Sequence, residues 1–193
     1  MDDLADRRKL ILAAAEKLLE HYGVSKTTVA DIAREAAIGV GTVYLEFGSK
    51  NDIIKHIASA RHAEILGRLR AAAEGEGSFS ERLVALLDTR VETFVRYARC
   101  GTHAMDLVHC RCRPVEVSWD EYVRSEHALV EDLIHRAVTD GEFDVVDAGR
   151  TARAILKAYV SFAPPWVFRE PPAEVREDLR ALHRIILMGV ARR

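Results

Sequence analysis

Apolar residues recur at helical spacing along almost the whole chain. The first such face holds residues that stand four positions apart: Leu10, Ala14, Leu18 and Tyr22. They share one side of a helix that Gly23 can end. Similar spacing returns in the later segments, whereas no stretch alternates convincingly as a half-buried strand does, and no internal repeat is found. The pattern predicts an all-α fold of about nine helices.

Capping pairs divide this pattern into separate helices. Each pair places an acidic residue three positions after a hydroxyl residue: Thr28 with Asp31, Ser49 with Asp52, Ser78 with Glu81, and Ser118 with Glu121. Asp147 can cap a further helix, and the prolines at 171 and 172 suit the first turn of the last one. The second pair opens a long helix over 50–73, which the breaker EGEGS at 74–78 ends. A short helix after Thr102 is expected to stop before Pro114.

The segments 28–36 and 40–47 are predicted to form two short helices joined by a tight turn at 37–39. This arrangement is typical of a helix-turn-helix. Two such helices cannot bury their apolar faces alone, so we expect them to pack on the first helix as a three-helix head. Val43 and Phe47 are expected to face inward and Leu45 outward.

The sequence resembles the tetracycline-repressor (TetR) family of bacterial regulators at this point. The matching residues are TTVADIAREA at 27–36, GTVY at 41–44, Phe47, and SK at 49–50, in register over about 45 residues. The resemblance implies a helix-turn-helix DNA-binding domain at 1–50 and a ligand-binding and dimerisation domain at 51–193. Helix 50–73 would link the two. The rest of the chain matches the family in helix count and length.

The resemblance also implies which residues meet DNA. Thr28, Tyr44 and Lys50 fall at phosphate-contacting positions, and Thr42 lies near the groove. The candidate DNA-binding residues are Thr27, Thr28, Gly39, Val40, Gly41, Thr42, Tyr44, Leu45, Glu46 and Lys50. Arg7, Arg8 and Lys9 stand where the family often reaches the DNA backbone or minor groove.

The charge of the head is unusual for a DNA-binding unit. Residues 1–56 hold eight Lys or Arg against nine Asp or Glu, and the whole chain has a formal net charge of -2. Hydroxyls, backbone amides and a few cations must then position the head on the DNA backbone. We therefore expect the affinity for DNA to depend only weakly on salt concentration. Leu45 is expected to touch a thymine methyl and Glu46 to accept from a cytosine amine, which would set sequence preference.

The body is expected to hold an effector and the dimer interface. The resemblance implies a homodimer through helices 147–163 and 172–190, packed as a four-helix bundle. A small, mostly apolar effector would release the protein, as a repressor, from a palindromic double-stranded DNA operator. Candidate ligand-binding residues are Phe94, Tyr97, His103, Met105, Trp119, Tyr122, Tyr159, Phe162 and Trp166, with Arg96, Arg99 and Asp106 as further polar anchors. His183 is expected to be a hydrogen-bonded packing residue.

Two alternatives stay open at this level. His109, Cys110 and Cys112 stand close enough near Pro114 to share a metal ion or to sense thiol chemistry, although two small core thiols and a helix-end histidine explain them as well. The chain could also be a helical interaction module that has lost operator binding, since Glu46 opposes phosphate and Gly39 replaces a capping serine.

The motifs of the common enzyme classes are missing from the sequence. The sequence has no Walker A loop, no G-x-S-x-G, no H-E-x-x-H and no glycine-rich dinucleotide turn, so we expect no enzyme, no metal and no cofactor. Three cysteines, an odd number, argue against a disulfide framework. No apolar run approaches the roughly 20 residues that a membrane span needs, and the first residues lack a signal-peptide core. A soluble, cytoplasmic protein without a membrane partner is expected.

Overall fold

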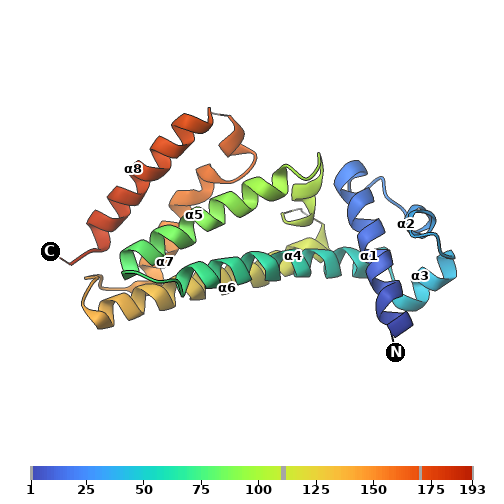
Figure 1. Ribbon diagram of the computed structural model, residues 1–193, viewed down its shortest axis with the longest axis horizontal. Coiled ribbons are helices and arrows are strands. Elements are labelled where there is room, and N and C mark those ends of the chain that lie inside the picture. Colours follow the sequence, from blue (N-terminus) through green and yellow to red (C-terminus); the bar gives the residue numbers. More distant parts are fainter. Residues whose placement is uncertain (1, 110–111, 170, 193) are drawn as a thin grey trace. The chain divides into compact units, whose positions relative to one another are not determined.

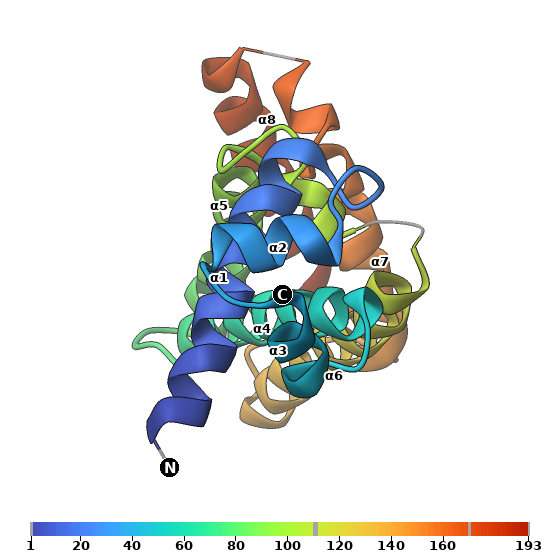
Figure 2. The same cartoon turned by 90° about the vertical axis from the view of Figure 1, so that its right-hand side faces the viewer.

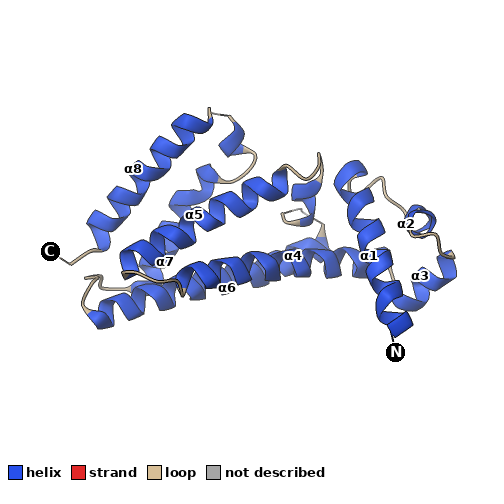
Figure 3. Ribbon diagram, viewed as in Figure 1, coloured by secondary structure: helices blue, strands red, loops and turns tan. Residues whose placement is uncertain are grey.

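The computed structural model describes residues 2–109, 112–169 and 171–192. Within these ranges the chain is helical and contains no strand, as the single colour of its coiled ribbons in Figure 3 shows. The α-helices are α1 (Asp2–Tyr22), α2 (Val29–Glu35), α3 (Val40–Glu46), α4 (Lys50–Ala73), α5 (Phe79–Ala98), α6 (Arg113–Asp140), α7 (Ala148–Ala158) and α8 (Pro172–Val190). Short 3-10 helices are η1 (Ala104–Leu107), η2 (Tyr159–Phe162) and η3 (Trp166–Phe168). The predicted all-α class is confirmed.

Local capping chemistry begins these helices as the sequence predicts. The backbone N–H of Asp31 donates to the Thr28 hydroxyl, and the Asp31 carboxylate accepts from the Thr28 backbone, which completes a capping box. The Ser78 hydroxyl and the Glu81 carboxylate pair in the same way ahead of α5. The Asp147 carboxylate accepts from the backbone N–H of Arg150 at the start of α7. Each bond satisfies an N–H that the helix itself leaves free.

The predicted boundary at Ser118 is wrong. Helix α6 already begins at Arg113, and Pro114 lies in its first turn, where a missing N–H costs nothing. Ser118 is therefore inside the helix, only 3% exposed, with its hydroxyl 2.6 Å from Nδ1 of His62. The segment after Thr102 forms the 3-10 helix η1 instead of a short α-helix.

Packing divides the chain into two compact units. The first unit comprises Met1–Glu64 and Tyr97–Glu121, and the second comprises Ile65–Arg96 and Tyr122–Arg193. Helices α4, α5 and α6 each contribute residues to both units. The predicted domain division at residue 50 stays a prediction.

The first unit is built on α1. Helix α1 contacts α2, α3 and η1, and Figure 2 shows the three head helices toward the viewer. Its core joins buried apolar residues of the head to two from the later segment: Ile11, Ala15, Leu19, Ile32, Val43, Phe47, Ile53, Ile57, Leu107 and Val115. Fully burying an aliphatic side chain contributes about 1.5–3 kcal/mol, so this shared core fixes α2 and α3 against α1.

The second unit gathers parts of α4, α5 and α6 with α7 and α8 (Figure 1). Its largest fully buried side chains include Tyr122, Tyr159, Phe143, Ile65, Leu69, Leu83 and Leu86. Nε2 of His183 on α8 lies 3.6 Å from Asp88 Oδ1 on α5, and an ion pair between Arg90 and Glu126 ties α5 to α6. Among the described residues, no helix combines the length and the apolar character that crossing a membrane requires.

Candidate nucleic-acid interface and effector site

The turn between α2 and α3 orients the candidate recognition helix. Ala37 adopts the left-handed region with φ 54°, which an L-residue enters at a cost of about 1–2 kcal/mol. The N–H of Ile38 donates to the Ala33 carbonyl at 3.0 Å and closes the turn. Gly39 then serves as the N-cap of α3 without a side-chain hydrogen bond. The turn itself is therefore closed by backbone hydrogen bonds without a side-chain cap.

Helix α3 has a buried face and an exposed face. Val43 is fully buried and Phe47 is 4% exposed, as expected for the inward positions. Leu45 is 88% exposed, Tyr44 52% and Val40 42%, so three apolar or aromatic side chains face outward from seven residues. An isolated exposed leucine needs no explanation, but three such side chains on one helix face indicate a contact surface.

Glu46 lies differently from the outward carboxylate that the sequence suggested. Its side chain is only 7% exposed and stands 4.0 Å from Nε of Arg7 and 3.9 Å from Nη1 of Arg8. Arg8 Nη1 also donates to the Glu46 carbonyl at 2.5 Å, and its guanidinium lies 4.2 Å from the centre of the Phe47 ring. Glu46 therefore fastens α3 to α1. The pattern contained a signal for this, because Glu46 stands three residues after buried Val43.

Thr27 and Lys50 hold the turn that leads into α2. Thr27 is 2% exposed, and its hydroxyl donates to the Gly23 carbonyl at 2.9 Å, so that hydroxyl does not face solvent as a phosphate contact would require. The Lys50 ammonium donates to the carbonyls of Val24 and Thr27, both at 2.9 Å. An ammonium has three donors, so one remains for another acceptor.

The remaining head candidates lie at the surface. Thr28 is exposed, although its hydroxyl takes part in the capping box, and that bond lowers the pKa of Asp31 below its usual range. Gly39 and Gly41 are exposed, and an added Cβ at Gly41 would meet nothing within 4 Å. Thr42 is half-buried. Lys26 and Lys55 are exposed cations to which the described residues offer no ionic partner.

Helix α4 clamps α1 to the η1 segment within the first unit. Arg61 is 4% exposed, and its guanidinium donates to Glu16 at 2.7 Å and 3.0 Å and to Glu20. A further bond of 2.9 Å reaches the Ala104 carbonyl. The N–H of His103 donates to the Glu20 carbonyl at 2.9 Å. These bonds therefore tie the 101–107 segment to α1 of the head.

The second unit contains a buried polar cluster. Arg90 Nε donates to Glu126 at 2.7 Å, and the Tyr122 hydroxyl donates to the same carboxylate oxygen. All three residues are buried, and burial raises the pKa of Tyr122 well above its usual value. Phe94 packs edge-on against Tyr122 at 6.2 Å and beneath Arg90 at 5.1 Å.

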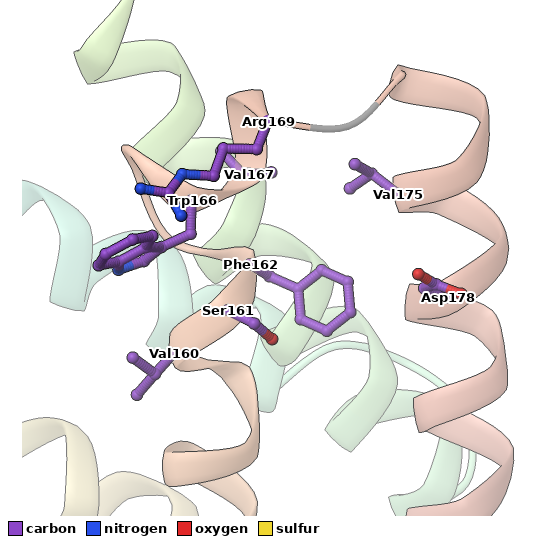
Figure 4. Close-up of a pocket in the computed structure, with 8 residues that line it drawn as sticks. All are labelled: Val160, Ser161, Phe162, Trp166, Val167, Arg169, Val175 and Asp178. Atoms are coloured by element: carbon purple, nitrogen blue, oxygen red, sulfur yellow. The ribbon is translucent and has the colours of Figure 1, made fainter.

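The predicted ligand-binding residues fall into two groups. Phe94, Tyr122 and Tyr159 are buried in the second unit, and Phe162 and Trp166 line a pocket there of about 440 Å³. Figure 4 shows Phe162 pointing toward the helix that carries Val175 and Asp178, and Trp166 pointing away from it. The other four predicted residues, Tyr97, His103, Met105 and Trp119, belong to the first unit.

Three of those four make side-chain contacts within the first unit. The Tyr97 hydroxyl donates to Glu64, and His103 pairs with Asp106 at 3.0 Å. Trp119 packs against His62 and His109, with ring centres 5.8 Å and 4.8 Å away.

Sequence reasoning missed three polar residues of the second unit: Arg90, Thr93 and Glu126. His183 is 8% exposed and Nε2 has no hydrogen-bond partner among the described residues, contrary to the expected hydrogen-bonded role. A signal was available, because Arg90 and Thr93 interrupt the apolar stripe of α5 at the spacing of Leu83, Leu86 and Leu87.

The sequence suggested that His109, Cys110 and Cys112 could share a metal ion. Cys110 lies outside the described residues, His109 is exposed, and Cys112 is half-buried. Elsewhere in the described ranges no three His, Cys, Asp or Glu side chains lie close enough together to hold a metal ion.

Comparison with known proteins covers both parts of the chain. The family model described as "Bacterial regulatory proteins, tetR family" matches residues 11–57, and the model "Tetracyclin repressor-like, C-terminal domain" matches residues 79–183. The uncharacterized HTH-type transcriptional regulator YhgD of Bacillus subtilis is 28% identical, over 96% of this chain and 97% of its own.

Solved structures share the fold over nearly the full length. A TetR/AcrR-family transcriptional regulator from Thermobifida fusca has a TM-score of 0.72 at 27% identity, with 97% of this chain and 100% of that chain covered. The regulator FadR from Bacillus subtilis, solved with stearoyl-CoA, has a TM-score of 0.74 at 15% identity, with 94% of this chain and 98% of that chain covered.

Proposed function

Because this chain belongs to the TetR family of bacterial regulatory proteins, we propose that it is a ligand-responsive repressor that binds a palindromic operator as a homodimer. It acts in the cytoplasm, on double-stranded DNA, and a small, mostly apolar effector releases it. Members of the family are transcriptional regulators with a helix-turn-helix, which agrees with the absence of catalytic motifs noted in the sequence.

The observation that carries this proposal is the exposed face of α3. Its inner face is anchored by Val43 and Phe47, so the outer side chains are held at fixed positions. Leu45 offers an apolar surface for a thymine methyl, and Tyr44 offers a hydroxyl to a phosphate oxygen. Val40 adds a second apolar contact at the start of the helix.

The role of three other candidates changes within this proposal. Glu46 acts as the link between α3 and α1, and it neutralises Arg7 and Arg8 instead of reading a base. Thr27 supports the turn from inside. Lys50 fixes the start of α4 and keeps one donor for a phosphate. Side-chain cations then neutralise few phosphates. This agrees with the weak salt dependence of DNA binding that the composition predicts.

Exposed apolar residues support dimerisation through the last helices. Ile185 is 68% exposed and Met188 74% on α8, and both stand at a spacing that places them on one face. Covering such a face with the same face of a second copy gives a two-fold interface. Two heads related by that axis would meet half-sites about one or more helical turns apart.

A buried polar cluster beside an apolar pocket supports an effector site in the second unit. FadR of Bacillus subtilis, which shares the fold, was solved with stearoyl-CoA, a ligand with a long apolar part. An effector shifts the regulator only as far as its affinity for two states differs, so it must favour the released state by a few kcal/mol.

Selection of genomic DNA fragments with the purified protein tests the proposal. Recovery of a palindrome that gel shifts then verify is the expected result, and absence of enrichment for any sequence would refute operator binding. Leu45→Ala should weaken or broaden the selected motif. Val146→Ala, which truncates a fully exposed valine of the second unit, is the matched control and should leave the motif unchanged.

A further inference from the structure

Four buried polar atoms of the second unit have no hydrogen-bond partner among the described residues. They are Arg90 Nη1, Thr93 Oγ1, Tyr159 Oη and His183 Nε2. Native proteins pair nearly all such groups, because an unpaired buried donor loses its bonds to water without replacement. Four of them in one unit therefore indicate a group that is absent from the protein chain itself.

The four residues come from elements that pack together. Arg90 and Thr93 stand three residues apart on α5 and share one face. Tyr159 of η2 stacks on His183 of α8, with ring centres 6.0 Å apart and ring planes at 24°. Asp88 Oδ1 of α5 lies 3.6 Å from His183 Nε2, which joins these two pairs. Burial raises the pKa of Tyr159, and of the charges that act on this phenol Asp88 raises the pKa further while Arg90 lowers it.

The charge of the cluster defines what it lacks. The Glu126 carboxylate accepts from Nε of Arg90 at 2.7 Å and leaves Nη1 unpaired, so either a neutral or an anionic oxygen can accept from Nη1. Burial lowers the pKa of His183 and favours its neutral form, although the facing Asp88 opposes this. Guanidinium nitrogens only donate, and the two hydroxyls can donate as well. What is missing is an oxygen that accepts several hydrogen bonds.

A pocket lined mostly by apolar side chains, with Ser161, Arg169 and Asp178 as its polar members, lies next to the cluster. Phe162 lines the pocket of about 440 Å³ together with Val160 and Val175, and its ring centre is 5.8 Å from that of Tyr159. Figure 4 shows the Phe162 ring directed into this space. One aromatic side chain therefore touches both the apolar pocket and the polar cluster.

We propose that the effector is a molecule with an apolar body and one terminal oxygen acceptor, a carbonyl or a carboxylate, which Arg90, Thr93, Tyr159 and His183 bind. Its apolar body lies against Phe162. This inference rests on the proposed function, because it names the chemistry of the effector that the repressor would sense. A purely apolar ligand would leave the four donors unpaired, so the site discriminates against it.

Isothermal calorimetry with the full-length protein and three matched probes tests this. The probes are 4-butylbenzoate, methyl 4-butylbenzoate and butylbenzene, which share the apolar body. We expect butylbenzene to bind at least about tenfold more weakly than the better of the other two. Binding of both oxygen-bearing probes identifies a carbonyl acceptor, whereas binding of the acid alone identifies a carboxylate. Equal binding of butylbenzene, or no binding of any probe, would overturn the inference.

Tyr159→Phe and Thr93→Val remove single hydroxyls with little change of shape. Each should weaken binding of the better probe about 3- to 10-fold, and Tyr159→Phe should keep or raise the melting temperature because the lost hydroxyl has no partner. Tyr22→Phe, an exposed phenol on α1 outside both proposed sites, is the control for probe binding. Unchanged affinity or a lower melting temperature in Tyr159→Phe contradicts the inference. Operator binding is measured on the same preparations, and its loss would instead refute the proposed function.

Discussion

Arg61 provides a quantitative test of how the head is held. It is almost fully buried at 4% exposure, and its guanidinium contacts two acidic residues of α1 and the Ala104 carbonyl. Arg61→Met keeps the apolar stem and removes every one of these bonds. Arg61→Lys keeps the charge but loses the planar fork that reaches several acceptors at once.

The expected cost follows from the number and exposure of these bonds. Hydrogen bonds that involve a charged group contribute about 1.5–3 kcal/mol each, and removing one partner of a buried ion pair costs about 3–5 kcal/mol. Glu16 is 43% exposed and Glu20 22%, so both carboxylates regain water when the arginine is lost. We therefore expect the free energy of unfolding to fall by about 3 kcal/mol in Arg61→Met and by about half of that in Arg61→Lys.

Urea unfolding followed by far-UV circular dichroism measures this difference. With a slope of about 2–3 kcal/mol per molar urea, Arg61→Met should lower the midpoint by about 1–1.5 M. Arg68→Met is the matched control, because Arg68 is an exposed arginine on the same helix. A double-mutant cycle with Glu16→Gln should give a coupling energy near 1 kcal/mol. A midpoint shift no larger than that of Arg68→Met would refute the reasoning.

Three further outcomes follow from single residues. Ala37→Gly should raise the free energy of unfolding by about 0.5 kcal/mol, because relief of the left-handed strain exceeds the added entropy of the unfolded chain; a lower urea midpoint would contradict this. Burial lowers the pKa of His62, so the unfolded state binds a proton more readily and stability falls as pH drops through the unfolded value near 6.5. The free energy of unfolding should therefore fall less between pH 7 and 5.5 in His62→Gln than in the unaltered protein. If unfolding titrations show the same pH dependence for both, His62 is not the source of that pH dependence. In fragment selection Glu46→Ala should leave the preferred sequence unaltered while Leu45→Ala alters it, and the reverse pattern would restore Glu46 as a base-reading residue.

The sequence was sufficient wherever the deciding interactions are local. Capping residues bond to backbone groups three positions away, so Thr28, Ser78 and Asp147 could be recognised as helix starts from spacing alone. Helical periodicity likewise placed Val43 and Phe47 inward and Leu45 outward, because residues three and four apart share a face whatever the helix packs against. The class of the fold and the helix-turn-helix follow from such patterns.

Only the tertiary structure decided which neighbour covers each remaining face. Glu46 stands at the border of the buried stripe, and its direction depends on where α1 brings Arg7 and Arg8. Burying the charge of Arg90 is costly unless it is paired, and its partner is Glu126, 36 positions away on another helix. Spacing along one helix carries no information about a partner on another. The anchoring of the recognition helix and the polar cluster of the second unit are therefore properties of packing between helices.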